Sequence, residues 1–304
     1  MNGEDEMKQF LGNAVRGALT LGLVAALGPL AAGAALAADG QPRDFVPAPA
    51  GTHLGLLYYL HGSSDTFVDG SGDKIPGSEL DTNIGIARYV YFFDVGDTRA
   101  DINVVQLFGG LSDMSIGGQR LATDDFSLGD TSIVATFWPI NEPERNRYFA
   151  VATWLTLPTG HYDANVSGLG TNRWSVSVQP AYYFNLAPRW SVDLVGDVTS
   201  YGDNDDGPGG IRIEKDPSFT VLGWLNYHAS NATTVSFGVS TTHGGEERWG
   251  GVARGDSRVT TPRMAWSQML NPTTQLLLEM GTDVDAENTF ERDFEAVLRL
   301  AKFF

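Results

Sequence analysis

The sequence predicts an all-β protein, a transmembrane antiparallel up-and-down β-barrel of about 12 strands that follows a cleaved signal peptide. Three observations support this prediction. Residues 289–304 alternate between apolar and mostly charged side chains, short and long connections alternate along the chain, and aromatic residues gather at strand ends next to the short connections. Strands with lipid on one side and a lumen on the other have this pattern. For residues 289–304 taken alone, an amphipathic edge strand of a soluble sandwich is the alternative.

The front of the chain, residues 1–37, has the pattern of a secretory signal peptide. Two basic residues precede an uncharged apolar run at 18–30, and Ala35-Leu36-Ala37 is a small-x-small cleavage site. We therefore expect the mature chain to begin at Ala38. We also expect translation to start at Met7, which would make the first six residues an artefact. A membrane-anchoring helix is the weaker alternative, because the apolar run is shorter than the roughly 20 residues that span a bilayer.

A proline-rich segment, residues 38–50, separates the signal peptide from the predicted barrel at 51–304. It contains three prolines and no hydrophobic periodicity, which indicates an extended segment rather than a strand. Two placements are open. The segment hangs loosely in the periplasm, or it folds back into the barrel as a plug with Phe45 and Val46 as its contacts.

The barrel region divides into twelve predicted strands, at 52–62, 79–92, 98–111, 128–138, 148–157, 171–184, 190–201, 215–228, 232–243, 256–269, 273–285 and 288–303. Long Gly-, Asp- and Ser-rich connections fall at 63–78, 112–127, 158–170, 202–214 and 244–255. Short ones fall at 95–97, 139–146, 185–188, 230–231, 270–272 and 286–287. Barrels of this kind have short periplasmic turns and long surface loops, so an even strand number places both termini on the periplasmic side. The short connection at 286–287 breaks the alternation.

Side-chain parity predicts which face of each strand meets lipid. The apolar sets, such as Val235, Phe237 and Val239, are assigned to lipid, because a basic residue there would cost about 2–4 kcal/mol near the midplane. Lys302 falls on the apolar parity but can snorkel at an interface. The inward parity then carries the candidate selectivity residues Arg88, Asp193, Asp197, Arg263, Glu279, Asp283, Asp293, Glu295 and Arg299. It also carries the apolar candidates Trp154, Tyr183, Leu222 and Trp224.

Two alternatives to a selective lumen remain open from the sequence. The charged residues would equally form a salt-bridge ladder that fills a narrow barrel. A register error of one residue would turn the apolar candidates outward.

Composition narrows the function classes. Without residues 1–37 the chain has 34 acidic and 18 basic residues, a net charge of -16, which argues against nucleic acid and suits contact with divalent cations or lipopolysaccharide. Cysteine is absent. Residues 203–207 resemble half of a calcium loop but lack the downstream glutamate, and no pair of the five histidines has metal-ligand spacing. We therefore predict no metal, no cofactor and no catalytic residue.

Two short motifs resemble a known family. They are Leu157-Pro-Thr-Gly-His-Tyr-Asp163 and Gly170-Thr-Asn-Arg-Trp174, which opens a predicted strand. Together with the signal peptide they resemble the outer-membrane channel family named for the putative meta-pathway of phenol degradation, over roughly residues 50–304. The resemblance implies a monomeric twelve-stranded barrel that passes small hydrophobic or aromatic molecules.

The expected function is passive uptake of such molecules across the bacterial outer membrane. A barrel lipid hydrolase is one alternative, although no motif fixes a serine beside a histidine. A structural or adhesive barrel with acidic surface loops is the other. Expected partners are outer-membrane lipid and lipopolysaccharide, the solute, and the barrel assembly machinery, which would recognise the C-terminal Phe304.

Overall fold

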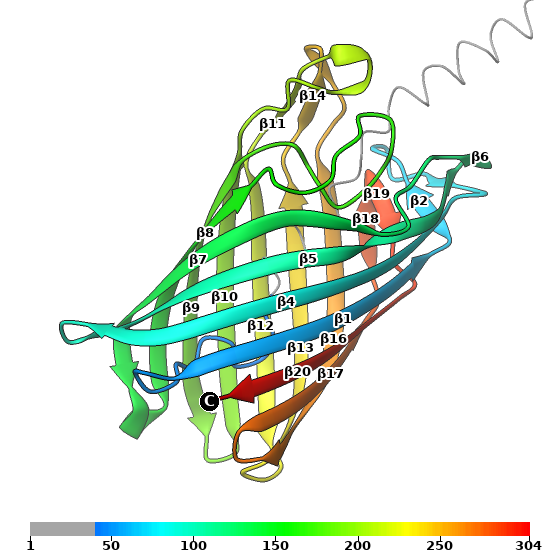
Figure 1. Ribbon diagram of the computed structural model, residues 1–304. Coiled ribbons are helices and arrows are strands. Elements are labelled where there is room, and N and C mark those ends of the chain that lie inside the picture. The colour runs from blue at the N-terminus through cyan, green and yellow to red at the C-terminus, as the bar shows by residue number, and fades with distance from the viewer. Residues whose placement is uncertain (1–39) are drawn as a thin grey trace, which may run out of the picture.

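A closed antiparallel barrel forms the body of the computed structural model, which describes residues 40–304 (Figure 1). The predicted signal peptide lies outside the described residues. The wall strands are β1 (His53–Ser64), β4 (Glu79–Val95), β5 (Thr98–Ile116), β7 (Ser127–Glu142), β8 (Arg147–Leu157), β9 (Ser175–Ala187), β10 (Trp190–Tyr201), β12 (Ser218–His228), β13 (Thr233–Gly244), β16 (Ser257–Asn271), β17 (Thr274–Gly281) and β20 (Phe294–Phe303). Each pairs with the next along the chain, so the predicted fold class is confirmed.

Closure of the sheet joins its first and last strands. β1 pairs antiparallel with β20, from Leu54 opposite Phe303 to Ser63 opposite Phe294. The backbone of His53 and Phe304 continues this ladder with two further hydrogen bonds of 2.9 and 3.0 Å. Because hydrocarbon offers no hydrogen-bond partner, a wall without free edges is the arrangement that lipid requires of a sheet. The barrel that the sequence predicts is thus closed by its first and last strands, β1 and β20.

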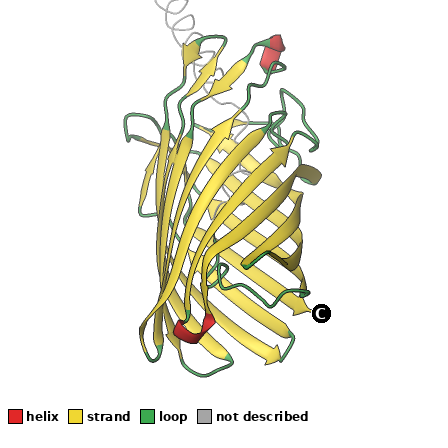
Figure 2. Ribbon diagram, turned by 90° about the vertical axis from the view of Figure 1, so that its left-hand side faces the viewer, coloured by secondary structure: helices red, strands yellow, loops and turns green. Residues whose placement is uncertain are grey.

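Shorter elements decorate the barrel (Figures 1 and 2). At the end that carries the long loops, β2 (Thr66–Val68), β3 (Lys74–Ile75) and β19 (Thr289–Glu291) form one small sheet, and β11 (Ile213–Lys215), β14 (Glu247–Trp249) and β15 (Val252–Ala253) form another. β6 (Gln119–Arg120) pairs with β5, and β18 (Asp285–Glu287) pairs with β16. The 3₁₀ helices are η1 (Pro143–Arg145), in a short turn, and η2 (Pro208–Gly210), in a long loop.

The last connection differs from the prediction. β17 ends at Gly281 and β20 begins at Phe294, so the connection spans 282–293 and is long, whereas a short hairpin at 286–287 was expected. Arg292 holds this excursion together: its backbone N–H donates to Asp283 Oδ2 (2.9 Å) and its guanidinium reaches Asp283 Oδ1 (3.0 Å). The alternation of short and long connections is thereby complete around the barrel.

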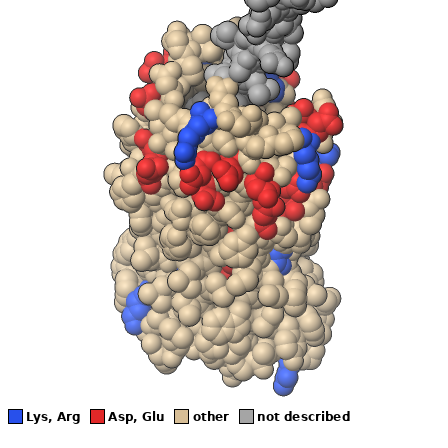
Figure 3. All heavy atoms as spheres, turned by 90° about the vertical axis from the view of Figure 1, so that its right-hand side faces the viewer, with Lys and Arg blue, Asp and Glu red and all other residues tan. Residues whose placement is uncertain are grey.

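The two faces of the wall differ as parity predicts. Outward side chains such as Phe237 and Val239 are half exposed, and inward ones such as Asn226 and Ser236 are buried. On the face shown in Figure 3, acidic residues and most basic ones gather toward the loop end, and the lower half is largely uncharged. An uncharged outer band below a charged rim is what a bilayer demands of a barrel. Among residues 40–304, no helix is long and apolar enough to cross a membrane.

Candidate functional site: the lumen and the segment inside it

The N-terminal segment, residues 40–50, lies inside the barrel. Gln41 and Phe45 are each only 8% exposed, and Val46 packs against the apolar cluster inside the barrel. Two hydrogen bonds make the segment a compact turn, from Asp44 N to the carbonyl of Gln41 and from Val46 N to the carbonyl of Arg43, both 3.1 Å. Arg43 adopts a left-handed φ of 67° within it. Tertiary contacts must therefore hold this turn in place.

Wall side chains bind the backbone of this segment. Trp138 Nε1–H donates to the carbonyl of Phe45 (2.9 Å), and Trp224 Nε1–H donates to the carbonyl of Gly40 (3.0 Å). The guanidinium of Arg99 donates to the carbonyl of Ala48. A proline-rich segment offers carbonyls but few N–H groups, and the wall supplies donors at matching positions.

Charged groups form a second set of anchors, centred on Asp44. Arg299 Nη1 lies 2.7 Å from Asp44 Oδ1, and Arg88 Nη1 lies 4.0 Å from Asp44 Oδ2. On the other side of the turn, Arg43 N donates to Asp193 Oδ1 (3.2 Å), whose second oxygen accepts from Asn226 Nδ2 (2.6 Å). Asp44 is paired with arginine, and Asp193 accepts hydrogen bonds from a backbone N–H and an amide, so the two buried carboxyl groups fix the segment against opposite parts of the wall.

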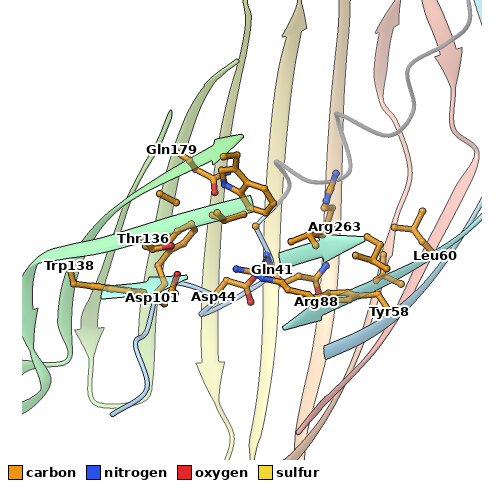
Figure 4. Close-up of a pocket in the computed structure, with 18 of the residues that line it drawn as sticks. Gln41, Asp44, Tyr58, Leu60, Arg88, Asp101, Thr136, Trp138, Gln179 and Arg263 are labelled. Carbon is orange, nitrogen blue, oxygen red and sulfur yellow. Dashed lines mark hydrogen bonds and ion pairs between the residues drawn. The ribbon is translucent and has the colours of Figure 1, made fainter. Parts of the chain in front are cut away.

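A cavity lies beside this segment (Figure 4). Its lining combines apolar and aromatic residues with nearly as many polar and charged ones, so it is more polar than the usual small-molecule site. The apolar and aromatic residues are Phe45, Tyr58, Leu60, Ile86, Val105, Val134, Trp138, Ala152, Trp154 and Val297. The others are Gly40, Gln41, Asp44, Arg88, Asp101, Thr136, Gln179, Arg263 and Glu295.

One side of the cavity is held by a polar chain of contacts. The guanidinium of Arg88 lies 5.6 Å from the ring centre of Trp154, a cation–π contact. Arg88 Nε donates to Asn103 Oδ1 (2.6 Å), and Asn103 Nδ2 donates to Asp101. The orientation of the Trp154 ring is thereby set by residues on two neighbouring strands, β4 and β5.

A second charged cluster lies inside the barrel toward the loop end. Arg263 Nη1 is 3.2 Å from Glu279 and its Nη2 is 4.0 Å from Glu295, with all three side chains under 5% exposed. Arg292 joins Glu295 to Asp283, whose other contact is the hydroxyl of Thr261 (2.6 Å). These five charged groups draw β16, β17, β20 and the connection 282–293 together from the inside.

The predicted selectivity residues divide between these clusters, except for Asp293 and for Asp197, which accepts hydrogen bonds from the hydroxyls of Ser177 and Thr199. Asp193, Asp197, Arg263, Glu279, Asp283, Glu295 and Arg299 are buried, and Arg88 lines the cavity. Asp293 was expected to point into the lumen, but it is exposed. It is the last residue of the connection 282–293, and β20 begins only at the next residue, Phe294. Partial burial raises the pKa of Asp293, opposed by the hydrogen bond that Asp65 N donates to its carboxylate (2.8 Å).

The four apolar candidates are all buried, at 8% exposure or less. Trp154 lines the cavity. Leu222 and Trp224 instead lie against the segment at Gly40, and Tyr183 lies against Tyr148 with ring centres 5.8 Å apart. Trp224 also covers Gly238, where an added Cβ would come within 2.4 Å of the indole. Leu222 and Trp224 therefore support the segment, and none of these three residues lines the cavity.

Several lining residues were missed by the sequence analysis. Asp101 shares the inward parity of Asn103 and Val105 on β5, so parity would have found it. Gln41 and Asp44 have no such signal, because the segment around them has no periodicity.

One serine lies beside a histidine at the short-turn end of the barrel. Ser191 Oγ is 2.9 Å from His228 Nε2, and His228 Nδ1 is 3.3 Å from the hydroxyl of Thr234. A hydrolase needs its nucleophile open to substrate and its histidine oriented by a third group. Ser191 has no exposed surface, so the pair forms part of the inner polar network in this structure.

Acidic residues in the loops bind groups within the same loops. Asp69 Oδ1 accepts from the backbone N–H groups of Ser71 (2.8 Å) and Asp73 (3.0 Å), and Asp203 pairs with Arg212. Within residues 40–304, no group of three or more His, Cys, Asp or Glu side chains is arranged to hold a metal ion.

Asp130 organises the two sequence motifs. It is buried on β7, and its oxygens accept from Gly160 N (2.8 Å), Thr171 N (2.9 Å) and Thr171 Oγ1 (2.6 Å). The predicted strand at 171–184 therefore begins later, at Ser175, because Thr171 is bound to Asp130 rather than to a neighbouring strand.

We expect Asp130→Ala to cost about 1–3 kcal/mol, because three donors lose a buried acceptor. Faster hydrogen exchange and protease cleavage at 158–174 would report the loss. Asp125→Ala, which removes an exposed carboxylate in the loop just before β7, is the matched control and should leave both unchanged. Equal protection in the two variants would show that Asp130 does not order this loop.

Comparison with known proteins identifies the family. The family model described as "Putative MetA-pathway of phenol degradation" matches residues 64–297. The chain belongs to this family. Comparison with curated protein sequences found no significant match.

Solved structures resemble this phenol-degradation family barrel. A COG4313 outer membrane channel from Pseudomonas putida F1 is similar with a TM-score of 0.82 and 30% identity, over 88% of this chain and 100% of that chain. The β domain of the Bordetella autotransporter BrkA is similar in fold, with a TM-score of 0.52 and 9% identity, over 84% of this chain and 100% of that chain. The protein is thus a channel-type barrel of the bacterial outer membrane.

Proposed function

We propose that the protein takes up small hydrophobic or aromatic molecules passively across the outer membrane. The observation that carries the proposal is the cavity beside residues 40–50, where the rings of Phe45, Trp138 and Trp154 adjoin aliphatic side chains. Burial in such a lining stabilises an apolar solute by roughly 25 cal/mol per Å² of its surface. The family description, which names phenol degradation, agrees with an aromatic solute.

The proposed path runs along the lumen. The solute enters among the long loops, rests in the cavity and leaves toward the short-turn end when residues 40–50 move aside. The segment is held by polar contacts with the wall and has no covalent tie to it, since the chain has no cysteine. A molecule of this type needs no catalytic group, and the burial of Ser191 speaks against a hydrolase.

The same proposal includes the oligomeric state of the barrel and its partners in the membrane. The barrel works as a monomer, with lipid and lipopolysaccharide around its uncharged band. The assembly machinery recognises the chain end at Phe304, whose side chain is exposed next to the β1–β20 seam.

Filling the cavity tests the proposal. Ala152 is an inward lining residue, and Thr153 beside it points outward. Ala152→Phe should lower the uptake of dilute toluene by cells about tenfold, toward the level of a strain without the gene, while Thr153→Phe should leave it unchanged. Heat-modifiable mobility on gels checks that each variant folds. Equal uptake by the two folded variants would remove the cavity from the path.

Charge selectivity is a second expected property. The cavity presents the carboxylates of Asp44, Asp101 and Glu295 against the cations of Arg88 and Arg263. An anionic solute meets this excess of negative charge without water to screen it. We expect 4-methylbenzoate to be taken up several-fold more slowly than 4-methylphenol. Reversal potentials in planar bilayers should show cation-selective residual current, and anion-selective current would contradict the assignment.

A further inference from the structure

The cavity is built jointly by the barrel wall and the N-terminal segment. Of its nineteen lining residues, four belong to the segment: Gly40, Gln41, Asp44 and Phe45. In the view of Figure 4, Gln41 and Asp44 stand between lining residues of the wall, with Trp138 on one side and Tyr58 on the other. The cavity is therefore complete only while the segment lies in the lumen.

Phe45 supplies the apolar part of the segment's share of the lining. Its ring is 8% exposed and belongs to the buried apolar cluster that includes the lining residues Val105 and Val134. A Cβ at Gly40 would lie 3.5 Å from this ring, so the ring folds back over the start of the segment. Val46, the next residue, also packs against the cluster but does not line the cavity. Phe45 and Val46 therefore separate contact with the cavity from packing against the wall.

The anchors of the segment are not groups that an apolar solute can replace. Arg299, Trp224 and Arg99 bind the segment through Asp44 and through backbone carbonyls, and none of these three residues lines the cavity. A hydrocarbon also has no donor or acceptor with which to compete for a hydrogen bond. A solute in the cavity therefore adds contacts to the segment and removes none of these anchors.

Binding of this kind is linked to the position of the segment. A ligand shifts a conformational equilibrium toward the state that it binds more tightly, and only by its difference in affinity between the two states. A solute contacts Phe45 only while the segment is inside the barrel, so its affinity is higher for the closed state. The open state keeps only the contacts that the wall supplies.

We propose that an apolar solute in the cavity locks residues 40–50 in the lumen, and that Phe45 couples the solute to the segment. The proposal rests on the proposed uptake function and adds its regulation. The cavity is then an occluded site, and an occupied barrel opens more rarely than an empty one. Uptake depends on the infrequent openings in which the solute gives up its contact with the segment.

Hydrogen exchange of the segment tests this inference, on the full barrel in nanodiscs with and without toluene. Four backbone N–H groups of the segment are hydrogen-bonded and exchange when it leaves, those of Gln41, Arg43, Asp44 and Val46. Toluene is added at ten times its dissociation constant for the wild type, measured by calorimetry against empty nanodiscs. We expect exchange about threefold to tenfold slower, about tenfold being the limit for a ligand that binds only the closed state. The amides of β13 in the same sample report any general effect of toluene.

Two neighbouring substitutions separate the lock from ordinary packing. Phe45→Ala and Val46→Ala should both speed the exchange of the segment without toluene, because each removes apolar contacts with the cluster. At the same toluene concentration, the slowing should fall to less than half of the wild-type factor in Phe45→Ala and stay at that factor in Val46→Ala.

Three results would overturn the lock while leaving uptake intact. They are faster exchange with toluene bound, an unchanged rate with toluene bound, and equal slowing in the two variants. If the wild-type barrel neither bound toluene nor took it up, the uptake function itself would fail.

Discussion

Replacing Asp44 by alanine should release the N-terminal segment and raise the single-channel conductance of the barrel about tenfold. Asp44 receives Arg299 at 2.7 Å, faces Arg88 at 4.0 Å and accepts a hydrogen bond from Gln41 N. Removing one partner of a fully buried ion pair destabilises a structure by about 3–5 kcal/mol. Because Asp44 is partly exposed, we expect a smaller loss of free energy here, about 1–3 kcal/mol. The substitution destabilises the state in which residues 40–50 occupy the lumen. It does not destabilise the state in which they have moved out, because water then solvates Arg299 and Arg88.

Planar-bilayer recordings of the folded variant measure this effect. Asp113→Ala is the matched control, since it removes an exposed carboxylate at the loop end of β5 that pairs with Arg120 of β6. Asp44→Asn keeps the size and should open the lumen to a smaller extent. A conductance equal to that of the wild type in both Asp44 variants would show that this carboxylate does not hold the segment.

A second large effect is expected on stability. An arginine placed on the lipid face should lower the free energy of unfolding of the barrel by about 2–4 kcal/mol. Val239, in the middle of β13, is 49% exposed and faces outward. Val239→Arg puts a guanidinium into hydrocarbon, where it must snorkel or thin the bilayer. Equilibrium unfolding in guanidinium chloride from liposomes measures the free energy of unfolding.

Val252→Arg is the control for this substitution. Val252 is similarly exposed, at 58%, but lies in β15 of the loop sheet, where an arginine meets water. We expect it to change stability by less than about 0.5 kcal/mol. If the two variants had equal stability, β13 would not face lipid at Val239.

Much of the wall was predictable from the sequence because parity is a local signal. The alternation of Phe294, Leu298 and Leu300 with Glu295 and Arg299 assigns the two faces of β20 correctly, although the predicted strand began six residues too early, at 288. Lys302 is the one charged residue on the apolar parity of this strand, and it was expected to reach the interface. Its Nζ donates to the hydroxyls of Thr273 (2.8 Å) and Thr274 (3.3 Å) at the short-turn end.

Features fixed by distant contacts were not predictable in this way. Arg292 and Asp283 have the spacing of a strand continuation in the sequence, and only their mutual hydrogen bonds show that the chain leaves the wall there. The same holds for Gln41 and Asp44. Their positions depend on Arg299 and Arg88, which lie far along the chain, and no local pattern records that pairing.

A reversible disulfide between the N-terminal segment and the wall tests the proposed path most directly. A Cβ at Gly40 would lie 3.9 Å from Val195 Cγ2, so Gly40→Cys and Val195→Cys are neighbours in a chain that has no other cysteine, and thiol titration after oxidation shows that they have formed the disulfide. We predict that oxidation lowers toluene uptake at least tenfold and that a reductant restores it. Uptake that is the same in the oxidised and reduced forms would contradict passage through the lumen past residues 40–50.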